Sequence, residues 1–328
     1  MDNLNIRITF ALIMKFSVTI PAYKSQFLKE AIESVVAQTY QDWELIIVDD
    51  CSPENLHSIA EPFLQDKRIH YYRNEKNCGA INVVYNWNIC LNHCIGDYVI
   101  CMGDDDRLLP RCLEEYRNLI DRHPDLNVYH TRTEIINEKR IVIDTQEERP
   151  EWESVLSLIW NRWNHRNKQY IGDFCYATNY LKQAGGYHKL PLAWGTDDIT
   201  AVKAAKEKGI ANAQSFGFQY RENAQTITSS SKLSRIKLDV SITQYKWFGK
   251  LLEELSETNL SEDDSRLLST IEGPRKDYYF KSMGKHCTDY IKGSPLRLLE
   301  CHRLLKQVHF SPLAYLKWYV SSIYHLVK

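Results

Sequence analysis

Two groups of aspartates, each placed directly after an apolar run, offer the residue types from which a chemical site could be built. The first run ends in Asp49 and Asp50, and the second, further along the chain, ends in Asp104, Asp105 and Asp106. In an open α/β sheet, ligands bind beyond the carboxyl ends of the strands, so both groups would face one crevice. These carboxylates repel one another unless a divalent cation or a hydrogen-bonding ligand is present. The pattern predicts a site for a metal ion and a phosphorylated or hydroxyl-rich substrate.

The elements that would position these aspartates alternate between strands and helices. Apolar runs predict strands over residues 16–20, 45–48, 69–72 and 98–102. Apolar residues at helical spacing predict helices over residues 28–35, 53–63 and 83–94. Ser52 has the character of an N-cap and Pro53 that of a first helical residue, so we expect the second helix to begin there. The alternation indicates an α/β fold with a doubly wound, mainly parallel sheet.

The second half of the chain shows a looser pattern. We expect a helix over 112–121, a strand near Val128, a helix over 196–208 and a last strand over 216–220. Residues 137–170 are polar and rich in Trp, which indicates a mobile excursion from the fold. From residue 229 onward helical periodicity dominates. The expected organisation is therefore a short extension (1–14), an α/β domain (15–228) and a helical C-terminal region (229–328).

Composition and missing motifs narrow the classes of function. The net charge of −1 argues against nucleic acid as a partner, and nine scattered cysteines without a secretory signal indicate free thiols in the cytoplasm. The sequence contains neither the phosphate-binding P-loop pattern nor the glycine pattern of dinucleotide-binding folds. A metal ion held by carboxylates is then the simplest way to bind phosphates.

Several stretches together resemble the family 2 glycosyltransferases. The first three are Val18–Tyr23, Ala31–Tyr40 and Trp43–Ser52, and Gly96–Val99 and Gly103–Asp106 follow in the same order. The resemblance implies a GT-A fold and transfer, with inversion, from a nucleotide-diphosphate sugar (UDP-linked) to a hydroxyl of a glycan or lipid-linked acceptor. It also implies Mn²⁺ or Mg²⁺ as cofactor and a role in bacterial cell-surface polysaccharide synthesis.

The resemblance assigns donor-binding roles to five residues. It places Pro21, Ala22 and Tyr23 against the nucleoside. It makes Asp50 an acceptor of a hydrogen bond from the base, and it places Asp104 at the ribose.

The resemblance also makes Asp105 the metal ligand, with Asp106 beside it. Taken singly, an Asp between a strand and a helix often only caps the helix, and three successive acids can form a solvated turn. The order of both groups within the family pattern is what favours the functional interpretation.

A third acidic group, Asp197 and Asp198, follows Thr196. By resemblance this pair supplies the general base that removes the acceptor hydroxyl's proton, with Asp198 as the base and Asp197 as the main alternative. A structural interpretation is compatible with it, because Thr196 suits an N-cap and acids suit the first turn of a helix.

Two further positions rest on weaker resemblance. Arg221 lies in a segment, continuing to residues 226–228, that resembles the one closing over the donor, and it is expected to bind the diphosphate. The family commonly has Arg-Asn where this chain has Trp87-Asn88, so Asn88 is carried over as a donor-binding residue without its usual neighbour.

The C-terminal tail is basic and amphipathic. From Lys281 to the end, eight Lys or Arg face two acids, and Leu313, Leu316, Val320, Ile323 and Val327 form one helical stripe. This suits either peripheral contact with an anionic membrane or packing against the α/β domain.

Two other functions compete with a glycosyltransferase. A sugar nucleotidyltransferase would carry a Gly-rich basic loop after the first strand, and Pro21-Ala22-Tyr23-Lys24 is not such a loop. A non-catalytic sugar-nucleotide binding protein would not need both Asp105 and Asp198.

Overall fold

The computed structural model describes residues 14–223, 233–292, 294, 296–308, 310 and 312–327, and within the last range the side chains as far as residue 320. The expected extension over 1–13, the segment 226–228 and the boundary at 228/229 lie outside the described residues, as do the side chains of Ile323 and Val327.

A ten-stranded sheet forms the centre of the α/β part. Its strands are β1 (Phe16–Ala22), β2 (Trp43–Asp49), β3 (Ile69–Arg73), β4 (Tyr98–Cys101), β5 (Arg107–Leu108), β6 (Val128–Ile136), β7 (Val142–Thr145), β8 (Trp152–Glu153), β9 (Phe174–Ala177) and β10 (Ile210–Arg221). The order along the sheet is β3-β2-β1-β4-β9-β6-β10-β5, with β7 paired to β6 and β8 to β10.

The sheet is parallel in its first half and mixed in its second. Strands β3, β2, β1 and β4 run parallel, which confirms the expected doubly wound unit. Strand β9 enters antiparallel between β4 and β6, and β5, β7 and β8 are also antiparallel to their partners. Short connections rather than helical crossovers lead into several of these strands, and such connections favour antiparallel pairing.

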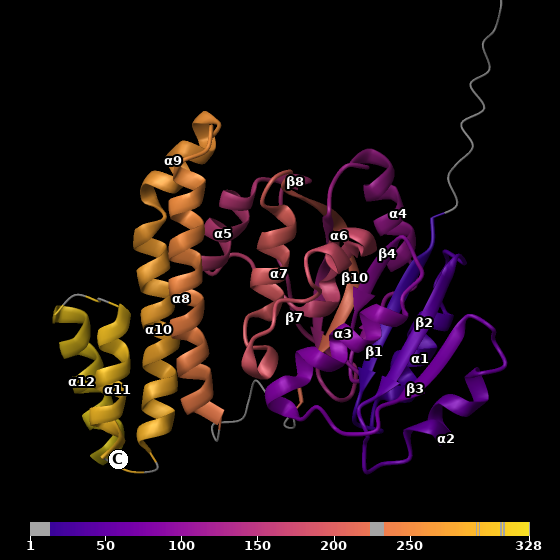
Figure 1. Ribbon diagram of the computed structural model, residues 1–328, viewed down its shortest axis with the longest axis horizontal. Helices are drawn as coiled ribbons and strands as arrows, with labels where there is room; N and C mark the ends of the chain where they lie inside the picture. Colours follow the sequence, from indigo (N-terminus) through magenta and orange to yellow (C-terminus); the bar gives the residue numbers. More distant parts are fainter. Residues whose placement is uncertain are drawn as a thin grey trace, which may run out of the picture.

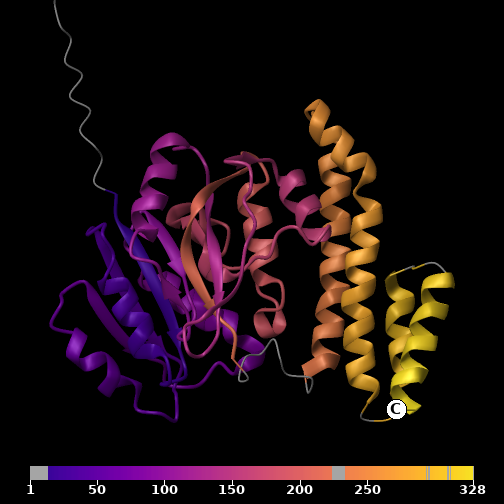
Figure 2. The same ribbon diagram turned by 180° about the vertical axis from the view of Figure 1, so that it is seen from behind.

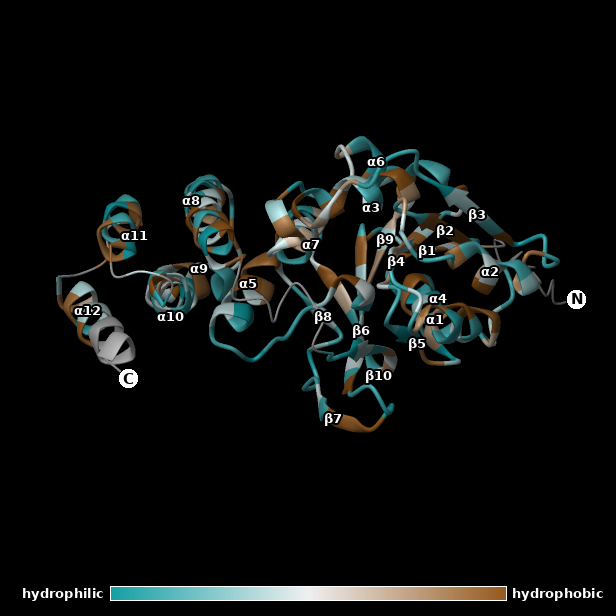
Figure 3. Ribbon diagram, turned by 90° about the horizontal axis from the view of Figure 1, so that it is seen from below, coloured by the Kyte–Doolittle hydropathy of each residue, from teal (hydrophilic) through white to brown (hydrophobic). Residues whose placement is uncertain are grey.

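Helices cover both faces of the sheet. In the α/β part they are α1 (Leu28–Val36), α2 (Leu56–Ala60), α3 (Val83–His93), α4 (Cys112–Arg122), α5 (Val155–Trp163), α6 (Thr178–Gln183) and α7 (Thr196–Ala205). Figure 3 shows α1 and α4 on one face of the sheet and α3 and α6 on the other. Short 3₁₀ helices occupy Glu61–Phe63, Ala80–Asn82, Ile171–Asp173, Pro191–Ala193 and Lys306–Val308.

The helical C-terminal region continues one of the two apolar cores. Its helices are α8 (Ser234–Ser256), α9 (Glu262–Thr270), α10 (Glu272–Ile291), α11 (Arg297–Leu305) and α12 (Pro312–Val327). The long helices α8 and α10 stand side by side next to α5 and α7, and α11 and α12 lie beyond them, at the end of the molecule away from β3 (Figures 1 and 2). Buried residues of α7, α8 and α10 belong to one continuous cluster, so this region is packed on the α/β part.

Three local expectations were wrong. The second helix begins after Asn55, whose side chain accepts a hydrogen bond from the Ser58 N–H. The Ser52 hydroxyl instead donates to the Tyr23 carbonyl and accepts from the Glu54 N–H. The helix at 196 is preceded by Gly195 in the left-handed conformation rather than capped by Thr196. The segment 137–170 is not an irregular excursion, since β7, β8 and α5 lie within it and α5 is buried against the C-terminal helices.

The tail helix α12 packs through one side only. Trp318 is buried, while Leu313, Leu316 and Val320 remain about 60% exposed. None of the helices in the described residues combines the length and apolar character that crossing a bilayer requires.

Candidate active site

One large pocket, about 760 Å³ in volume, opens at the carboxyl ends of the parallel strands. Its lining includes the ends of β1 and β2, the acidic turn after β4, the start of α7, and the facing sides of α8 and α10. Residues from the loop before α3, from α5 and the segment after it, and from the end of β10 also contribute. The volume lies within the range of about 300–1,000 Å³ that is usual for small-molecule sites. The pocket thus brings together all three acidic groups that the sequence pointed to.

Asp50 forms one end of this pocket and is held by a loop that crosses over it. Its Oδ1 accepts hydrogen bonds from Asn74 Nδ2 (2.8 Å) and from the Cys78 N–H (2.9 Å). Its own N–H donates to the carbonyl of Ala22 (2.9 Å), which fixes the end of β2 against the end of β1. Asp50 is nearly buried but still lines the pocket, so a bound group can reach this carboxylate.

The three residues expected at the nucleoside differ in what they present. Pro21 and Tyr23 line the pocket, and Tyr23 is largely exposed beside it. Ala22 is fully buried and contributes its backbone rather than its methyl group. The Ser52 hydroxyl donates to the Tyr23 carbonyl (2.6 Å), which ties this loop to the turn after β2.

Asp104 is buried and joins the acidic turn to the end of β1. Its Oδ2 accepts hydrogen bonds from the N–H groups of Tyr23 (2.6 Å) and Lys24 (2.7 Å). Burial, followed by repulsion from Asp105, raises the pKa of Asp104 to about 6 despite these hydrogen bonds. The carboxyl both shapes the loop and lines the pocket at the position expected to face a ribose.

Asp106 faces into the protein more than its neighbours do. Its Oδ1 accepts from the Arg221 N–H (3.0 Å) and its Oδ2 from the Gly103 N–H (3.2 Å). Burial and the charge of Asp105 raise its pKa well above the usual range of a carboxyl. A Cβ at Gly103 would come within 2.9 Å of the carboxylates of both Asp105 and Asp106, so these side chains would have to shift.

Asp105 is the member of the turn best placed to hold a metal ion. It is half-buried, lines the pocket, and its Oδ2 accepts one hydrogen bond from Asn223 Nδ2 (2.7 Å). Among the described residues no three His, Cys, Asp or Glu side chains gather to form a complete ligand set. Mg²⁺ is often held by one or two carboxylates, with substrate phosphates and water completing its shell, and this turn fits that arrangement.

Asp197 and Asp198 stand at the start of α7 and differ in their surroundings. Asp198 is nearly buried, and its Oδ1 accepts a hydrogen bond from Arg162 Nε of α5 at 2.9 Å. Asp197 is half-buried, and its Oδ1 accepts from the N–H of Asp198 (3.0 Å). Burial and the adjacent Asp198 carboxylate raise the pKa of Asp197 to about 8. One carboxylate is therefore fixed by a guanidinium, while the other holds a proton near neutral pH.

The C-terminal helices complete this pocket, which the sequence did not indicate. Gln244 of α8 donates to the Trp194 carbonyl (2.7 Å), and Tyr278, Tyr279 and Ser282 of α10 line the side facing α7. At Gly195, whose φ is +76°, an added Cβ would lie 2.6 Å from the Gln244 amide. Helix α8 thereby positions the loop that leads into the acidic pair. The only signal of this role in the sequence would have been polar residues that recur at helical spacing on the side of a helix that faces the pocket.

Besides Ala22, two further expected donor ligands lie outside the pocket lining. The Arg221 guanidinium is fully buried, where it donates to the Asp105 carbonyl (2.7 Å) and pairs with Glu30 (2.9 Å). Asn88 exchanges hydrogen bonds with the backbone of Tyr187, so it fastens α3 to the loop after α6. In this conformation both side chains support the site from behind, and their contact with a donor stays a prediction.

Two solved structures illustrate the similarity of this architecture to known proteins. The structure of S. aureus TarS 1-349 in complex with UDP-GlcNAc matches with a TM-score of 0.60 and 17% identity, covering 90% of this chain and 88% of that one. Mannosyltransferase PcManGT from Pyrobaculum calidifontis, in complex with GDP-Man and Mn²⁺, matches with a TM-score of 0.51 and 12% identity, covering 95% and 84%. At these identities the likeness shows the fold alone, which is the expected GT-A fold.

Two sequence relatives are named as putative glycosyltransferases. Putative glycosyltransferase EpsE of Bacillus subtilis is 32% identical over 127 residues, covering 38% of this chain and 45% of that protein. The putative colanic acid biosynthesis glycosyl transferase WcaA of Escherichia coli is 40% identical over 103 residues, covering 30% and 36%. The chain thus spans less than half the length of these curated relatives. Residues 17–183, just over half of the chain, match the family described as "Glycosyl transferase family 2", and we conclude that this protein belongs to it.

Proposed function

We propose that this protein transfers a sugar from a nucleotide-diphosphate sugar, UDP-linked, to a hydroxyl group of a glycan or lipid-linked acceptor, with inversion at the anomeric carbon. The observation that carries the proposal is the single pocket in which Asp50, Asp104 and Asp105 face the acidic pair of α7. A donor bound at Asp50, Asp104 and Asp105 would place its sugar between these residues and the acidic pair of α7. TarS, which shares the fold, is described in complexes with UDP-GlcNAc and with UDP, and this supports the choice of nucleotide.

Donor binding begins with the nucleotide end of the pocket. We propose that Asp50 accepts a hydrogen bond from an N–H of the base while Pro21 and Tyr23 contact its ring. Asp104, with its raised pKa, then meets a ribose hydroxyl at the floor of the pocket. The geometry adds that Ala22 acts through its backbone, since its carbonyl fixes Asp50.

The metal ion would be held by Asp105 at the acidic turn, with Asp106 supporting the turn from below. When bound, Mn²⁺ or Mg²⁺ neutralises the negative charge that develops on the departing diphosphate. PcManGT, which shares the fold, is described with Mn²⁺. The adjacent carboxyl groups of Asp104, Asp105 and Asp106 repel one another when ionised, which favours a cation there.

We propose that the proton of the acceptor hydroxyl passes to Asp197 while Asp198 stays paired with Arg162. The acceptor oxygen then bonds to the anomeric carbon, and the bond from that carbon to the phosphate oxygen breaks, with the electron pair leaving on the diphosphate. One displacement inverts the anomeric configuration. The order of the family pattern favours Asp198 as the base. The geometry favours Asp197, which is less buried than Asp198 and, unlike it, is not paired with the Arg162 guanidinium.

Titration of the purified protein with nucleotide sugars tests the proposal directly. Thermal unfolding with UDP-sugars, GDP-sugars and free nucleotides, each with and without Mn²⁺, should show stabilisation by UDP-sugars that depends on the metal. A sugar nucleotidyltransferase would instead release pyrophosphate from a nucleoside triphosphate and a sugar phosphate. A non-catalytic binding protein would bind donor without ever releasing UDP from it.

The C-terminal helices provide a surface for the acceptor's membrane. Leu296 and Leu299 at α11 are 80% and 64% exposed, and Leu313 and Leu316 of α12 are similarly uncovered, with Lys317 next to them. Leucines beside lysines suit shallow insertion into an anionic bilayer. We propose that this end of the molecule binds the membrane peripherally.

Vesicle sedimentation distinguishes this proposal from simple surface exposure. The protein should sediment with vesicles that contain an anionic lipid and remain in solution with zwitterionic ones. The double variant Leu313→Ser and Leu316→Ser should lose binding, whereas Glu262→Gln on α9, far from this surface, should bind as the wild type does. Equal binding by the serine variant, or dimerisation through the same leucines without vesicle binding, would contradict it.

A further inference from the structure

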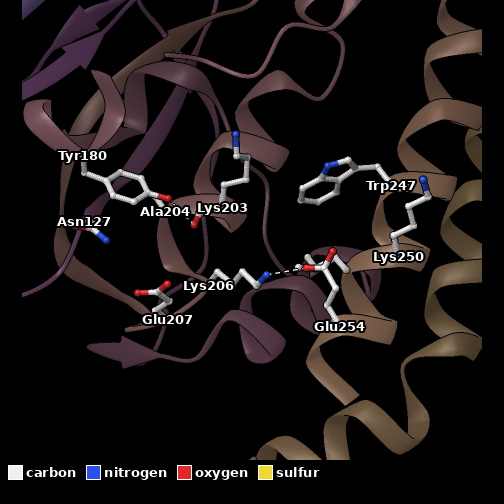
Figure 4. Close-up of a pocket in the computed structure, with 10 residues that line it drawn as sticks. Asn127, Tyr180, Lys203, Ala204, Lys206, Glu207, Trp247, Lys250 and Glu254 are labelled. Atoms are coloured by element: carbon white, nitrogen blue, oxygen red, sulfur yellow. Dashed lines mark hydrogen bonds and ion pairs between the residues drawn. The ribbon is translucent and has the colours of Figure 1, made fainter. Parts of the chain in front are cut away.

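A second cavity, about 340 Å³ in volume, lies between the α/β part and helix α8. Figure 4 shows Asn127, Tyr180 and the end of α7 on one side and Trp247, Lys250 and Glu254 of α8 on the other. We call this cavity the α7–α8 groove. None of its lining residues belongs to the active-site pocket, so the groove is a separate feature of the surface.

The groove has an aromatic wall. Trp247 is half-buried, with its ring held edge-on by Phe248 (4.9 Å between centroids) and next to His188 (5.9 Å). Across from it, Tyr180 donates its hydroxyl to the Lys203 carbonyl (2.8 Å), which fixes the phenol ring at the end of α7. Flat rings held in place by packing offer an apolar face to a ligand at little cost in side-chain entropy.

Apart from Ala204 and Leu251, the remaining lining residues are polar, and they include three lysines and two glutamates. Lys206 pairs with Glu254 (2.7 Å) and closes one end of the groove, as Figure 4 shows. Within the described residues, no ion pair neutralises the ammonium group of Lys203 or of Lys250, and Glu207 is the opposing charge at the rim.

We propose that the α7–α8 groove binds an anionic sugar unit, carboxylated or phosphorylated, through stacking on Trp247 and charge pairing with Lys203 and Lys250. An aromatic platform with a few convergent polar groups is the usual composition of a small-ligand site. The apolar face of a sugar ring would lie on the indole, and its acidic group would meet the ammonium groups.

Such a site would serve the proposed glycan acceptor, and in this respect the inference rests on the proposed function. Helix α7 begins at the acidic pair and ends at the groove, so the two sites share one rigid element. An acceptor chain held at a second point raises its effective concentration at the first. The groove would then favour long, charged acceptors over short or neutral ones.

Calorimetric titration of the full chain with defined oligosaccharides tests the inference. The probes are a galacturonate tetrasaccharide, a neutral maltotetraose and glucose 6-phosphate. We expect the galacturonate, the hexose phosphate or both to bind, and maltotetraose to bind at least about tenfold more weakly. Binding should weaken as salt shortens the range of charge interactions. The charged probe that binds tells a carboxylated from a phosphorylated ligand.

Substitutions in the groove localise the binding. Trp247→Ala should weaken binding of the charged probe by about tenfold, and Lys203→Gln or Lys250→Gln by about threefold to fivefold. Lys208→Gln, which removes the same charge just after α7 but outside the groove, should bind within about twofold of wild type. Because the lysine variants leave the packing intact, they remain informative if Trp247→Ala is unstable.

The outcomes separate this inference from the proposed function. UDP-sugar-induced thermal stabilisation should be unchanged in all groove variants, since none of these residues lines the active-site pocket. No binding of either charged probe up to about 10 mM, equal binding of maltotetraose, or binding unaffected by both lysine variants would overturn the inference. Any of these results would leave the donor-binding evidence for a glycosyltransferase intact.

Discussion

The acidic pair at the start of α7 makes a prediction about pH that separates its two members. If Asp197 takes the proton from the acceptor, the reaction needs its ionised form, and its pKa of about 8 in the empty pocket must appear in the rate. Because kcat/KM reports the free enzyme, it should rise with pH up to a plateau above that value. Asp197→Asn should remove the base and lower the rate by about 10²–10⁴-fold.

The size of the pH effect follows from the same value. With a pKa of about 8, the ionised fraction of Asp197 is 1/(1 + 10^(8−7)), or about 9%, at pH 7 and about 1% at pH 6. The rate should therefore fall about tenfold for each pH unit below 7. Substitution of Arg162 with Gln leaves the two carboxylates without their cation, which should raise the pKa of Asp197 further. The rising part of the pH–rate profile should therefore move to higher pH.

Release of UDP from a UDP-sugar, with water as the acceptor, provides an assay that needs no knowledge of the natural acceptor. Profiles between about pH 5.5 and 9 with saturating Mg²⁺ would be compared for the wild type and for Asp197→Asn, Asp198→Asn and Arg162→Gln. Calorimetric titration with UDP should give near-normal affinity for each variant, because all three changes lie at the acceptor side of the pocket. That control separates a chemical defect from lost binding.

A different pattern would refute the reasoning. If Asp197→Asn turns over normally while Asp198→Asn loses the activity, the base is Asp198, as the family pattern suggests. A rate that stays flat from pH 6 to pH 9 would also contradict an essential Asp197. A product with retained anomeric configuration would overturn the single-displacement mechanism for both residues.

Four further predictions concern the rest of the pocket. Asp105→Ala should abolish transfer and remove the metal-dependent part of donor stabilisation, and full activity in excess chelator would contradict the metal's role. Asp50→Asn should weaken UDP binding by about 1–3 kcal/mol in calorimetry, because a mismatched amide replaces an acceptor; unchanged affinity would contradict the contact. Gly195→Ala should lower the melting temperature, since its φ of +76° and the nearby Gln244 amide both oppose a Cβ; an unchanged value would show that the loop relaxes freely. In the folded state Asp197 keeps a proton that the unfolded chain releases above about pH 4, so wild-type stability should fall as pH rises towards 8. Asp197→Asn should flatten that dependence and raise the melting temperature at pH 8, and a steeper dependence in this variant would contradict the assigned pKa.

The sequence by itself determined the first half of the fold and the acidic residues that meet in the pocket. Strand–helix alternation with buried apolar runs defines β1 to β4, because a parallel sheet needs continuous apolar strands and helical crossovers. The acidic residues after β2 and β4 must then meet at one edge, and Asp50 and Asp105 do line one pocket. The order of the motifs was enough to predict the family, and the family match over residues 17–183 confirms this prediction.

Only the tertiary structure decided what each side chain does there. Arg221 looks like a diphosphate ligand in the sequence, but the fold surrounds it with backbone carbonyls and Glu30. Asp197 and Asp198 are adjacent and chemically identical, yet Arg162 from a separate helix fixes one and leaves the other facing the pocket. Both outcomes depend on contacts between residues far apart in the chain, and local sequence spacing carries no information about such contacts. The same holds for Gln244 and Trp247, which lie one helical turn apart on α8 and face two different cavities.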